Sequence, residues 1–302
     1  APIYSNGTTC TLTPSSCIYD GKPQEPKVTI SKNGVDLVEG RDFTVEYQNN
    51  TTLGNARAGI SGIGNYYGYF TTSFSITYGR ISNCDITVSN ESLVFDGTEK
   101  KPAVTVTCNG NTLTQGQDYT LYYHANTNAG SATVTITGKG RFSGSVEKAF
   151  QIQPADLSRS SVDLSADSFT YDGTEKKPSV TVKTGNRQLT ANSDYTVSFV
   201  NNTNAGSATV TVTGKGNYSG SVTKNFTISA ASLEKAELAL SASSFTYDGT
   251  EKKPDVTVTV NKKQLKKGTD YTVSYDNNTN IGTASVTITG KGNYSGTVTK
   301  SL

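Results

Sequence analysis

One motif recurs four times in the 302-residue chain and sets its organisation. It is clearest as Tyr171-Asp-Gly-Thr-Glu-Lys-Lys-Pro178, and related copies begin at Tyr19, Phe95 and Tyr247, each 76 residues from the next. A period kept without insertions is typical of tandem modules that each form one structural unit. We therefore expect four modules, at residues 1–79, 80–155, 156–231 and 232–302.

Within each module the residues alternate as in half-buried β-strands. In the third module Tyr195, Val197 and Phe199 fall on one face of a predicted strand, while Thr196 and Ser198 fall on the other. A period of two with apolar residues on one face indicates a strand that covers a core. The chain is rich in Thr, Ser, Val, Gly, Asn and Tyr and has no Met or Trp, which also favours strands and tight turns over helices.

Turn residues separate these segments every eight to twelve positions or so, which predicts about seven short strands per module and a β-sandwich. Asn33-Gly34 and Asn109-Gly110 are typical two-residue hairpin turns. Gly138-Lys-Gly-Arg-Phe-Ser-Gly144 has the wrong spacing for a phosphate loop and precedes a strand, so we expect a hairpin loop there. Asp42, Asp118, Asp194 and Asp270 are expected to shape the turns before a strand.

The linkers predict how the modules are joined. Gln153–Leu157 and Ser229–Leu233 are short and are not Gly/Ser-rich tethers. We expect an all-β chain of four tandem Ig-like sandwich modules that forms an elongated, semi-rigid rod. The last module ends before the position where the others place Phe74, Phe150 and Phe226, so its closing strand is expected to be shortened and the sequence to be part of a longer chain.

Four cysteines lie in the first two modules at spacings unlike those of a zinc site. We expect two local disulfides, Cys10–Cys17 and Cys84–Cys108, formed in an oxidising compartment. For the second pair, a hairpin between the strand after Cys84 and the strand that ends at Cys108 would bring the two residues together. The alternative is four unpaired buried thiols.

The Tyr-Asp-Gly, Asp-Tyr-Thr-Val and Gly-Lys-Gly-Asn-Tyr-Ser-Gly sequences together resemble the bacterial immunoglobulin-like repeats of the YDG/MBG type. The resemblance covers all four modules and is weakest in the first, where Lys22-Pro-Gln-Glu-Pro26 replaces Thr-Glu-Lys-Lys-Pro. It implies a secreted or cell-surface location and a spacer or adhesin role, with no catalytic residues to carry over.

No catalytic or metal-binding pattern stands out in the sequence. His124 is the single histidine, no serine lies in a nucleophile elbow, and the acidic residues lack the spacing of a calcium loop. We expect no enzyme activity, no cofactor and no metal site. A net charge of +2 without a basic block gives no case for nucleic acid, and no apolar run is long enough to enter a bilayer.

Lysines interrupt the apolar face of the last strand of three modules, at Lys148, Lys224 and Lys300. The simpler interpretation is a bulge or an edge lysine that discourages pairing between sheets. The sharper hypothesis is a lysine placed for an intramolecular amide bond with an Asn or Asp. Thr72 holds this position in the first module, which argues against a general cross-link.

Tyrosines of the first module are the best candidates for a binding surface, because exposed aromatic rings stack on sugars and anchor protein partners. The candidates are Tyr67, Tyr69 and Tyr78, since Tyr66 has aromatic counterparts in every other module. Core or inter-module packing is the alternative role for these rings.

Two functions fit these features. The first is a non-catalytic stalk or adhesin segment that spaces or presents a binding domain, with a surface glycan or a protein as the partner. The second is a carbohydrate-binding accessory region of a secreted enzyme, with binding by the tyrosine-rich first module.

Overall fold

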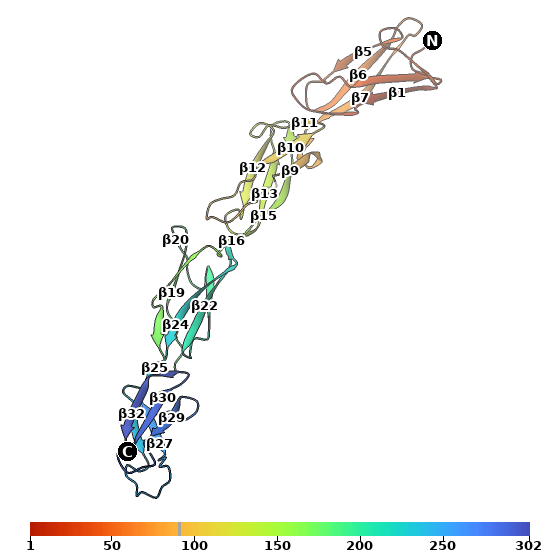
Figure 1. Cartoon of the computed structure of the whole chain (residues 1–302). Coiled ribbons are helices and arrows are strands. Elements are labelled where there is room, and N and C mark those ends of the chain that lie inside the picture. Colours follow the sequence, from red (N-terminus) through yellow and green to blue (C-terminus); the bar gives the residue numbers. More distant parts are fainter. Residues whose placement is uncertain (90–91) are drawn as a thin grey trace. The chain divides into compact units, whose positions relative to one another are not determined.

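The chain folds almost entirely into short strands, in accordance with the alternation of its residues. The computed structural model describes residues 1–89 and 92–302 (Figure 1). The chain divides into two compact units, Ala1–Gln153 and Pro154–Leu302. The boundaries of the four modules within these units stay predictions, and we use the predicted ranges as names for the first to fourth modules.

The strands recur with the sequence period. In the first module they are β1 (Thr8–Thr13), β2 (Ser16–Ile18), β3 (Lys27–Lys32), β4 (Val35–Asp36), β5 (Phe43–Gln48), β6 (Gly54–Gly62), β7 (Tyr69–Thr77) and the start of β8 (Gly79–Arg80). In the second they are β9 (Asp85–Val88), β10 (Val104–Cys108), β11 (Asn111–Thr112), β12 (Tyr119–His124), β13 (Gly130–Gly138), β14 (Phe142–Ser143) and β15 (Ser145–Ile152), after a short 3-10 helix, η1 (Ile81–Asn83).

The second unit repeats the order. The third module contains β16 (Ala155–Asp156), β17 (Ser161–Leu164), β18 (Ser168–Thr170), β19 (Val180–Thr184), β20 (Arg187–Gln188), β21 (Tyr195–Val200), β22 (Gly206–Gly214), β23 (Tyr218–Ser219) and β24 (Ser221–Ser229). The fourth contains β25 (Ala231–Ser232), β26 (Glu237–Leu240), β27 (Val256–Val260), β28 (Lys263–Gln264), β29 (Tyr271–Asp276), β30 (Ser285–Gly290), β31 (Tyr294–Ser295) and β32 (Thr297–Ser301).

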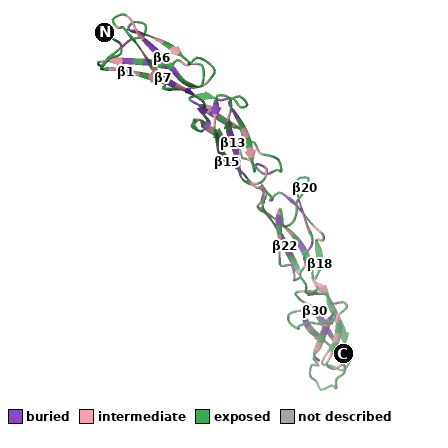
Figure 2. Ribbon diagram, turned by 180° about the vertical axis from the view of Figure 1, so that it is seen from behind, coloured by how far each residue is buried: buried purple, intermediate pink, exposed green. Residues whose placement is uncertain are grey.

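Two sheets face each other in each module. The third module pairs a β17-β19-β20 sheet with a β18-β24-β22-β21 sheet, and the first has the same arrangement in β1-β3-β4 and β2-β7-β6-β5. In the fourth module Val258 of one sheet and Ile288 of the other are both fully buried in one core cluster. The buried residues lie along the strands in Figure 2, with exposed residues between them. This is the predicted β-sandwich.

The alternation was predicted correctly. The strands β5, β12, β21 and β29 share one burial pattern, in which the first, third and fifth residues are buried or half-buried and the others are exposed. Ala132, Val134 and Ile136 of β13 are fully buried, as their spacing indicates. Asn33 and Gly34 both have positive φ, at 50° and 82°, which is the backbone that an Asn-Gly hairpin turn requires.

The first strand of the sandwich changes sheets in the first and third modules, which the sequence did not predict. β1 pairs with β3 in one sheet, and after Thr13 the chain crosses so that β2 runs parallel to β7 in the other. In the third module β17 and β18 divide in the same way, with β18 parallel to residues Thr227–Ser229 of β24.

The linkers are the least expected part of the fold, because they belong structurally to the module that follows. Ala231 and Ser232 form β25, which pairs in parallel with β31, and the next residue, Leu233, is fully buried in the core of the fourth module. Leu157 and Ile81 are also fully buried just after β16 and β8. At the N-terminus Ile3 takes the same role, since its N–H donates to the Tyr67 carbonyl and its side chain is buried in the first core.

The burial of Leu233 gives a direct test of this docking. We expect Leu233→Ala to lower the unfolding free energy of the fourth module by about 2–5 kcal/mol, because it leaves a cavity in a core that the linker completes. Urea unfolding of the full chain, monitored by tyrosine fluorescence, measures the change. Ile281→Ala is the matched control, because Ile281 is 85% exposed in the same module and its truncation should have little effect. Equal effects of the two substitutions would contradict the docking.

Candidate functional site

The recurring motif builds a turn around its aspartate. Asp172 accepts hydrogen bonds through Oδ1 from the backbone N–H and the hydroxyl of Thr174, at 2.8 and 2.6 Å. Gly173, with φ of 87°, supplies the left-handed residue of the turn. The Lys176 ammonium forms an ion pair with Asp172 Oδ2 at 2.5 Å, and the Lys176 side chain is only 11% exposed. The second and fourth modules form the same turn at Asp96 and Asp248.

A buried asparagine holds the motif to the rest of the sandwich. Asn202 is 8% exposed, and its Nδ2 donates to the Lys176 carbonyl at 2.9 Å, while the Lys176 N–H donates to the Asn202 carbonyl at 2.7 Å. Asn50, Asn126 and Asn278 make the same side-chain bond in the other modules. In the first module Gln24 replaces the lysine, and its amide donates to Asp20 at 2.6 Å, so the divergent copy keeps the geometry without the ion pair.

The motif aspartates Asp96, Asp172 and Asp248 are expected to make the stability of their modules depend on acidic pH. The Lys176 ammonium, followed by the Thr174 hydroxyl and N–H, lowers the pKa of Asp172 well below its usual range. A carboxyl with a lowered folded-state pKa stabilises the fold above its unfolded pKa of about 3.9, and this contribution is lost as the pH falls below that value.

We therefore expect the melting temperature of the chain to fall more steeply than that of Asp172→Asn between pH 4 and pH 2. The asparagine oxygen still accepts the Thr174 bonds but carries no charge to titrate. Thermal unfolding by circular dichroism across this range gives the comparison. Parallel curves for the two proteins would show that the ion pair does not contribute to stability.

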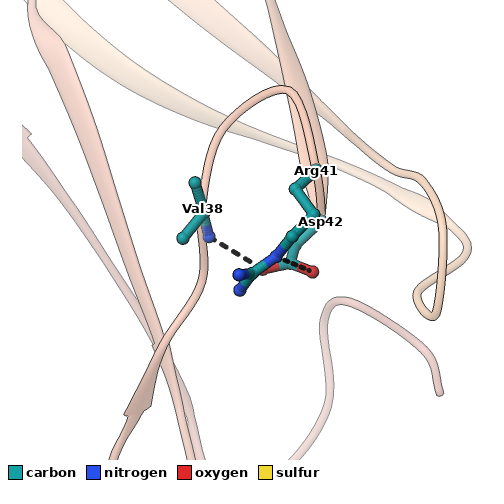
Figure 3. A network of polar contacts seen from close by, with 3 residues as sticks. All are labelled: Val38, Arg41 and Asp42. Carbon is teal, nitrogen blue, oxygen red and sulfur yellow. Dashed lines mark hydrogen bonds and ion pairs between the residues drawn. The ribbon is translucent and has the colours of Figure 1, made fainter.

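The four aspartates that immediately precede β5, β12, β21 and β29 shape a turn, as predicted. Asp42 Oδ2 accepts the Val38 N–H at 2.9 Å, and Asp118, Asp194 and Asp270 accept the equivalent N–H groups. Figure 3 shows that Arg41 also reaches the Asp42 carboxylate, at 2.7 Å from Nη2. The Arg41 hydrogen bonds, followed by the Val38 N–H, lower the pKa of Asp42. The carboxylates of these four aspartates are thus occupied by hydrogen bonds within their own turns.

The Gly-x-Gly segment is a hairpin loop, as predicted, and it also receives the linker. The loop joins β22 to β24, and Gly214 allows it to fold back, since a β-carbon there would lie 2.7 Å from the Ser219 nitrogen. The far side of the loop, β23, pairs in parallel with β16 of the linker. In the fourth module β31 receives β25 in the same way. Sequence periodicity could not reveal this second role, because a period does not show which segments of a module pair with each other.

The contact between the third and fourth modules extends beyond the linker. Tyr171 packs against the cores of both modules, and its ring meets that of Tyr294 edge to face, with centroids 5.6 Å apart. The Lys263 ammonium lies 5.6 Å from the centre of the Tyr171 ring. The electrostatic interaction with Tyr294, followed by that with Tyr171, raises the pKa of Lys263.

An asparagine adds two hydrogen bonds to this contact. Asn293 Oδ1 accepts the Ala205 N–H at 2.8 Å, and its Nδ2 donates to Asn204 Oδ1 at 3.1 Å. Tyr171, the first residue of the recurring motif, thus contacts the neighbouring module, whereas Asp172 and the residues after it form the turn within their own module. This role of Tyr171 was not predicted from the sequence.

The predicted tyrosine candidates are all exposed but do not form one surface. Tyr67, Tyr69 and Tyr78 are 63%, 58% and 45% exposed. Tyr69 begins β7 and Tyr78 follows its end, so nine residues of extended strand separate them, or about 30 Å. Tyr78 contacts Tyr19 edge to face at 6.3 Å. Ligand binding by these tyrosines stays a prediction. Tyr67 and Tyr69 could contribute to one surface, whereas Tyr78 would have to bind at a separate place.

Tyr69 has a structural partner that explains its position. Its ring lies across Gly59 of β6, where an added β-carbon would meet the Tyr69 hydroxyl, Cε2 and Cζ at 2.7, 3.0 and 3.2 Å. The equivalent pairs in the other modules are Thr135 with Ser145, Thr211 with Ser221, and Thr287 with Thr297. An aromatic ring that covers a strand glycine shields exposed backbone and stabilises the sheet. The glycine and the tyrosine of the first module therefore belong together.

One of the two predicted disulfides is formed. Cys84 and Cys108 are bonded, with Cα atoms 4.5 Å apart. The predicted Cys10–Cys17 bond is wrong, because both thiols are free. Cys10 lies in β1 opposite Ile30, whereas Cys17 lies in β2 opposite Ile76, so the change of sheet assigns the two residues to different layers. Burial raises the pKa of both thiols.

Two of the three lysines of the last strands, Lys224 and Lys300, bond across the sandwich. Lys224 Nζ donates to the Val162 carbonyl at 2.9 Å, and Lys300 Nζ donates to the Leu238 carbonyl at 2.8 Å. The bulge or edge interpretation is wrong for Lys224, because β24 lies between β18 and β22 and its register passes through Lys224 without interruption. The partner of each ammonium is a main-chain carbonyl of the facing sheet, which satisfies the charge but offers no group for an amide bond.

Two open clefts accompany these features. One, of about 430 Å³, lies between the first and second modules and includes Asp20, Arg141 and Phe142 in its lining. Asp20 accepts the Lys22 N–H, and Arg141 pairs with Asp118 at 3.1 Å, so both charges are engaged locally. The other, of about 400 Å³, lies in the fourth module and includes Phe245, Tyr247 and Leu302. Phe245 is the equivalent of Phe169, which lies in β18 of the third module and pairs there with β24.

Among the described residues, no group of three or more His, Cys, Asp or Glu side chains is placed to hold a metal ion. The described part of the chain also has no helix that is long and apolar enough to cross a membrane.

Comparisons with known proteins agree with the class of fold. Residues 170–230 match the family described as bacterial Ig-like domain (group 3), which supports Ig-like repeats of bacterial type. No curated protein is significantly similar to the chain.

Solved structures with detectable similarity include the protocadherin gamma B2 extracellular cadherin domains 1–5, at 10% identity over 100% of this chain and 77% of that one, with a TM-score of 0.24. The protocadherin gammaB7 EC3–6 cis-dimer structure is 9% identical over 95% of this chain and 97% of that one, with a TM-score of 0.22. Scores this low support no argument about function.

Proposed function

We propose that the chain is a non-catalytic stalk or adhesin segment of a bacterial secreted or cell-surface protein, built from repeats of the YDG/MBG type. It spaces or presents a binding domain whose partner is a surface glycan or a protein. The observation that carries this proposal is the docking of each linker into the following module. A linker that pairs with a loop and buries its apolar residue transmits force directly from one sandwich to the next.

The chemistry of the described residues is consistent with such a role. The motif aspartates and the turn aspartates are engaged in local hydrogen bonds or ion pairs, as at Asp172 and Asp194, and so are Lys224 and Lys300 of the last strands. A catalytic carboxylate or amine would instead face an open pocket with its reactive atom available. The Cys84–Cys108 disulfide fits an oxidising location outside the cell.

Stretching single molecules of the full chain tests the proposal. We expect separate unfolding events whose contour lengths correspond to the 76-residue period. One event should be shorter by roughly 90 Å, because the disulfide shields the 24-residue span between Cys84 and Cys108 at about 3.6 Å per residue. A reductant should restore its length. A chain that extends without resistance, or that unfolds in one event, would contradict the proposal that the chain is a stalk.

A second function, carbohydrate binding by the first module, is favoured by Tyr69. One side of its ring covers Gly59 and the ring is 58% exposed, so the opposite side is open on a sheet surface. A flat, exposed ring held in place by the backbone beneath it is suited to stack on a sugar ring. Tyr67 lies two residues earlier in the chain and would extend the contact.

The Gly59→Thr/Tyr69→Ser double variant separates this function from simple strand packing, because it installs the pair that the second module already uses. We expect the native chain to bind selected oligosaccharides on an array of defined glucose, galactose and N-acetylglucosamine polymers, and the double variant to lose that binding with an unchanged melting temperature. Absence of binding by the native chain, or equal binding by the variant, would exclude the Tyr69 site.

A further inference from the structure

We propose that the motif tyrosine of the third module and an Asn-Tyr pair in the fourth form a latch that fixes the angle between these two modules, and that the joint between the first and second modules lacks this latch and is the more compliant of the two. The latch consists of Tyr171, Asn204 and Ala205 on the third module and Lys263, Asn293 and Tyr294 on the fourth. This inference concerns the joints themselves and does not rest on the stalk proposal.

A linker strand alone restrains a joint weakly. Two residues of β25 pair with β31, and two adjacent sandwiches joined only in this way can bend and twist about that short ladder. Relative motion is the usual behaviour of domains unless their interface is extensive and apolar. Further contacts from parts of the chain that lie away from the linker are needed to fix an orientation.

The second unit has such contacts on two segments of the third module. Tyr171 comes from the recurring motif, and it packs against the fourth core with its ring 5.6 Å from that of Tyr294. Asn204 and Ala205 come from the loop before β22, and both bond the side chain of Asn293. Together with β25, three separate segments of the chain hold the loop that contains Asn293 and Tyr294.

The hydrogen bonds of the Asn293 side-chain amide also restrict which pairs of modules can form the latch. Asn293 must present its oxygen to the Ala205 N–H and its nitrogen to Asn204 at the same time, which a residue of another shape cannot do. The hydrogen bonds therefore depend on an Asn in the loop of the following module and on a suitable partner pair in the preceding one.

The first unit has different residues at every one of these positions except the tyrosine. Thr52 and Leu53 replace Asn204 and Ala205, Asn111 replaces Lys263, and Arg141 and Phe142 replace Asn293 and Tyr294.

The replacements do not rebuild the latch. Arg141 bonds Asp118 of its own module at 3.1 Å, and Tyr19 packs on Tyr78 of its own module. Leu53 is 42% exposed.

Among the described residues, the contacts at the first joint that correspond to those of the second unit are the contacts of the linker. β8 pairs in parallel with β14, the Gly79 N–H donates to the Arg141 carbonyl at 2.9 Å, and the Phe142 ring lies against Gly79. The open cleft of about 430 Å³ lies beside this contact, and its lining includes Ile18, Asn111 and Phe142. The space next to the linker is thus open at the first joint, whereas Tyr171 and Lys263 lie next to the linker contact at the joint in the second unit.

Pulsed dipolar EPR on the full chain measures the compliance of each joint. The spin-label sites must be equivalent in all modules, and the exposed residues Glu46, Tyr122, Ser198 and Ser274 meet this need, because each lies 76 residues from the next. Labels on the Glu46→Cys/Tyr122→Cys variant report on the first joint, and labels on Ser198→Cys/Ser274→Cys report on the joint in the second unit. Both variants also carry alanine in place of the two free cysteines and keep the disulfide.

We expect the 198/274 distance distribution to be about two-fold narrower than the 46/122 distribution, because only the former joint is held at sites beyond its linker. Tyr171→Ala and Asn293→Ala should each broaden the 198/274 distribution. Tyr247→Ala and Asn280→Ala are the matched controls, since these exposed residues are the equivalents of Tyr171 and Asn204 in the fourth module, and they should leave it unchanged.

Introducing the latch residues at the first joint tests whether they are sufficient to restrain a joint. Thr52→Asn, Leu53→Ala and Arg141→Asn together install the amide partners at the first joint, and they should narrow the 46/122 distribution. Circular dichroism and the melting temperature show that each variant is folded. Equal widths for the two native joints would overturn the asymmetry, and an unchanged 198/274 width in both Tyr171→Ala and Asn293→Ala would overturn the latch.

Discussion

The parallel pairing between a linker and the hairpin loop of the next module is the interaction on which the arrangement of each unit depends. It turns the connection into a strand of the following module and directs Leu157 or Leu233 into that module's core. The hydrophobic stabilisation of a module therefore includes a residue from its connection, and a module cannot detach from its linker without exposing that side chain to water. Folding of a module and attachment to its predecessor are thereby coupled.

The loop can accept the linker because of a glycine at its base. At Gly214 and Gly290 a β-carbon would lie 2.7 Å from the nitrogen of the serine that pairs with the linker, so any other residue would push that segment outward. The spacing of the Gly-x-Gly segment thus serves both the hairpin and the joint. A stretch that resembles a ligand-binding loop in sequence is here occupied by the protein's own chain.

Local features of the fold could be predicted from the sequence, whereas features that depend on two layers could not. The alternation in β21 is a property of one strand facing one core, so Tyr195, Val197 and Phe199 were assigned correctly. The pairing of Cys10 with Cys17 failed because nothing local shows that the chain changes sheets between them. The role of Lys224 was missed for the same reason, since its carbonyl partner lies on the facing sheet.

The motif tyrosine shows why the candidate sites were harder to predict than the fold. Tyr19 and Tyr171 hold equivalent positions in the repeat, yet the first packs on Tyr78 and the second on Tyr294 of the next module. The partners differ on both sides, because Asn293 and Tyr294 are replaced by Arg141 and Phe142 at the first joint, and Tyr78 is replaced by Ala230 in the third module. The residues that are shared by all repeats therefore form the sandwich, whereas the residues that differ between repeats change an individual surface or joint. The paired change to Gly59 and Tyr69 in the first module follows the same rule, since a ring that covers a glycine alters the face of a sheet while leaving its strands in place.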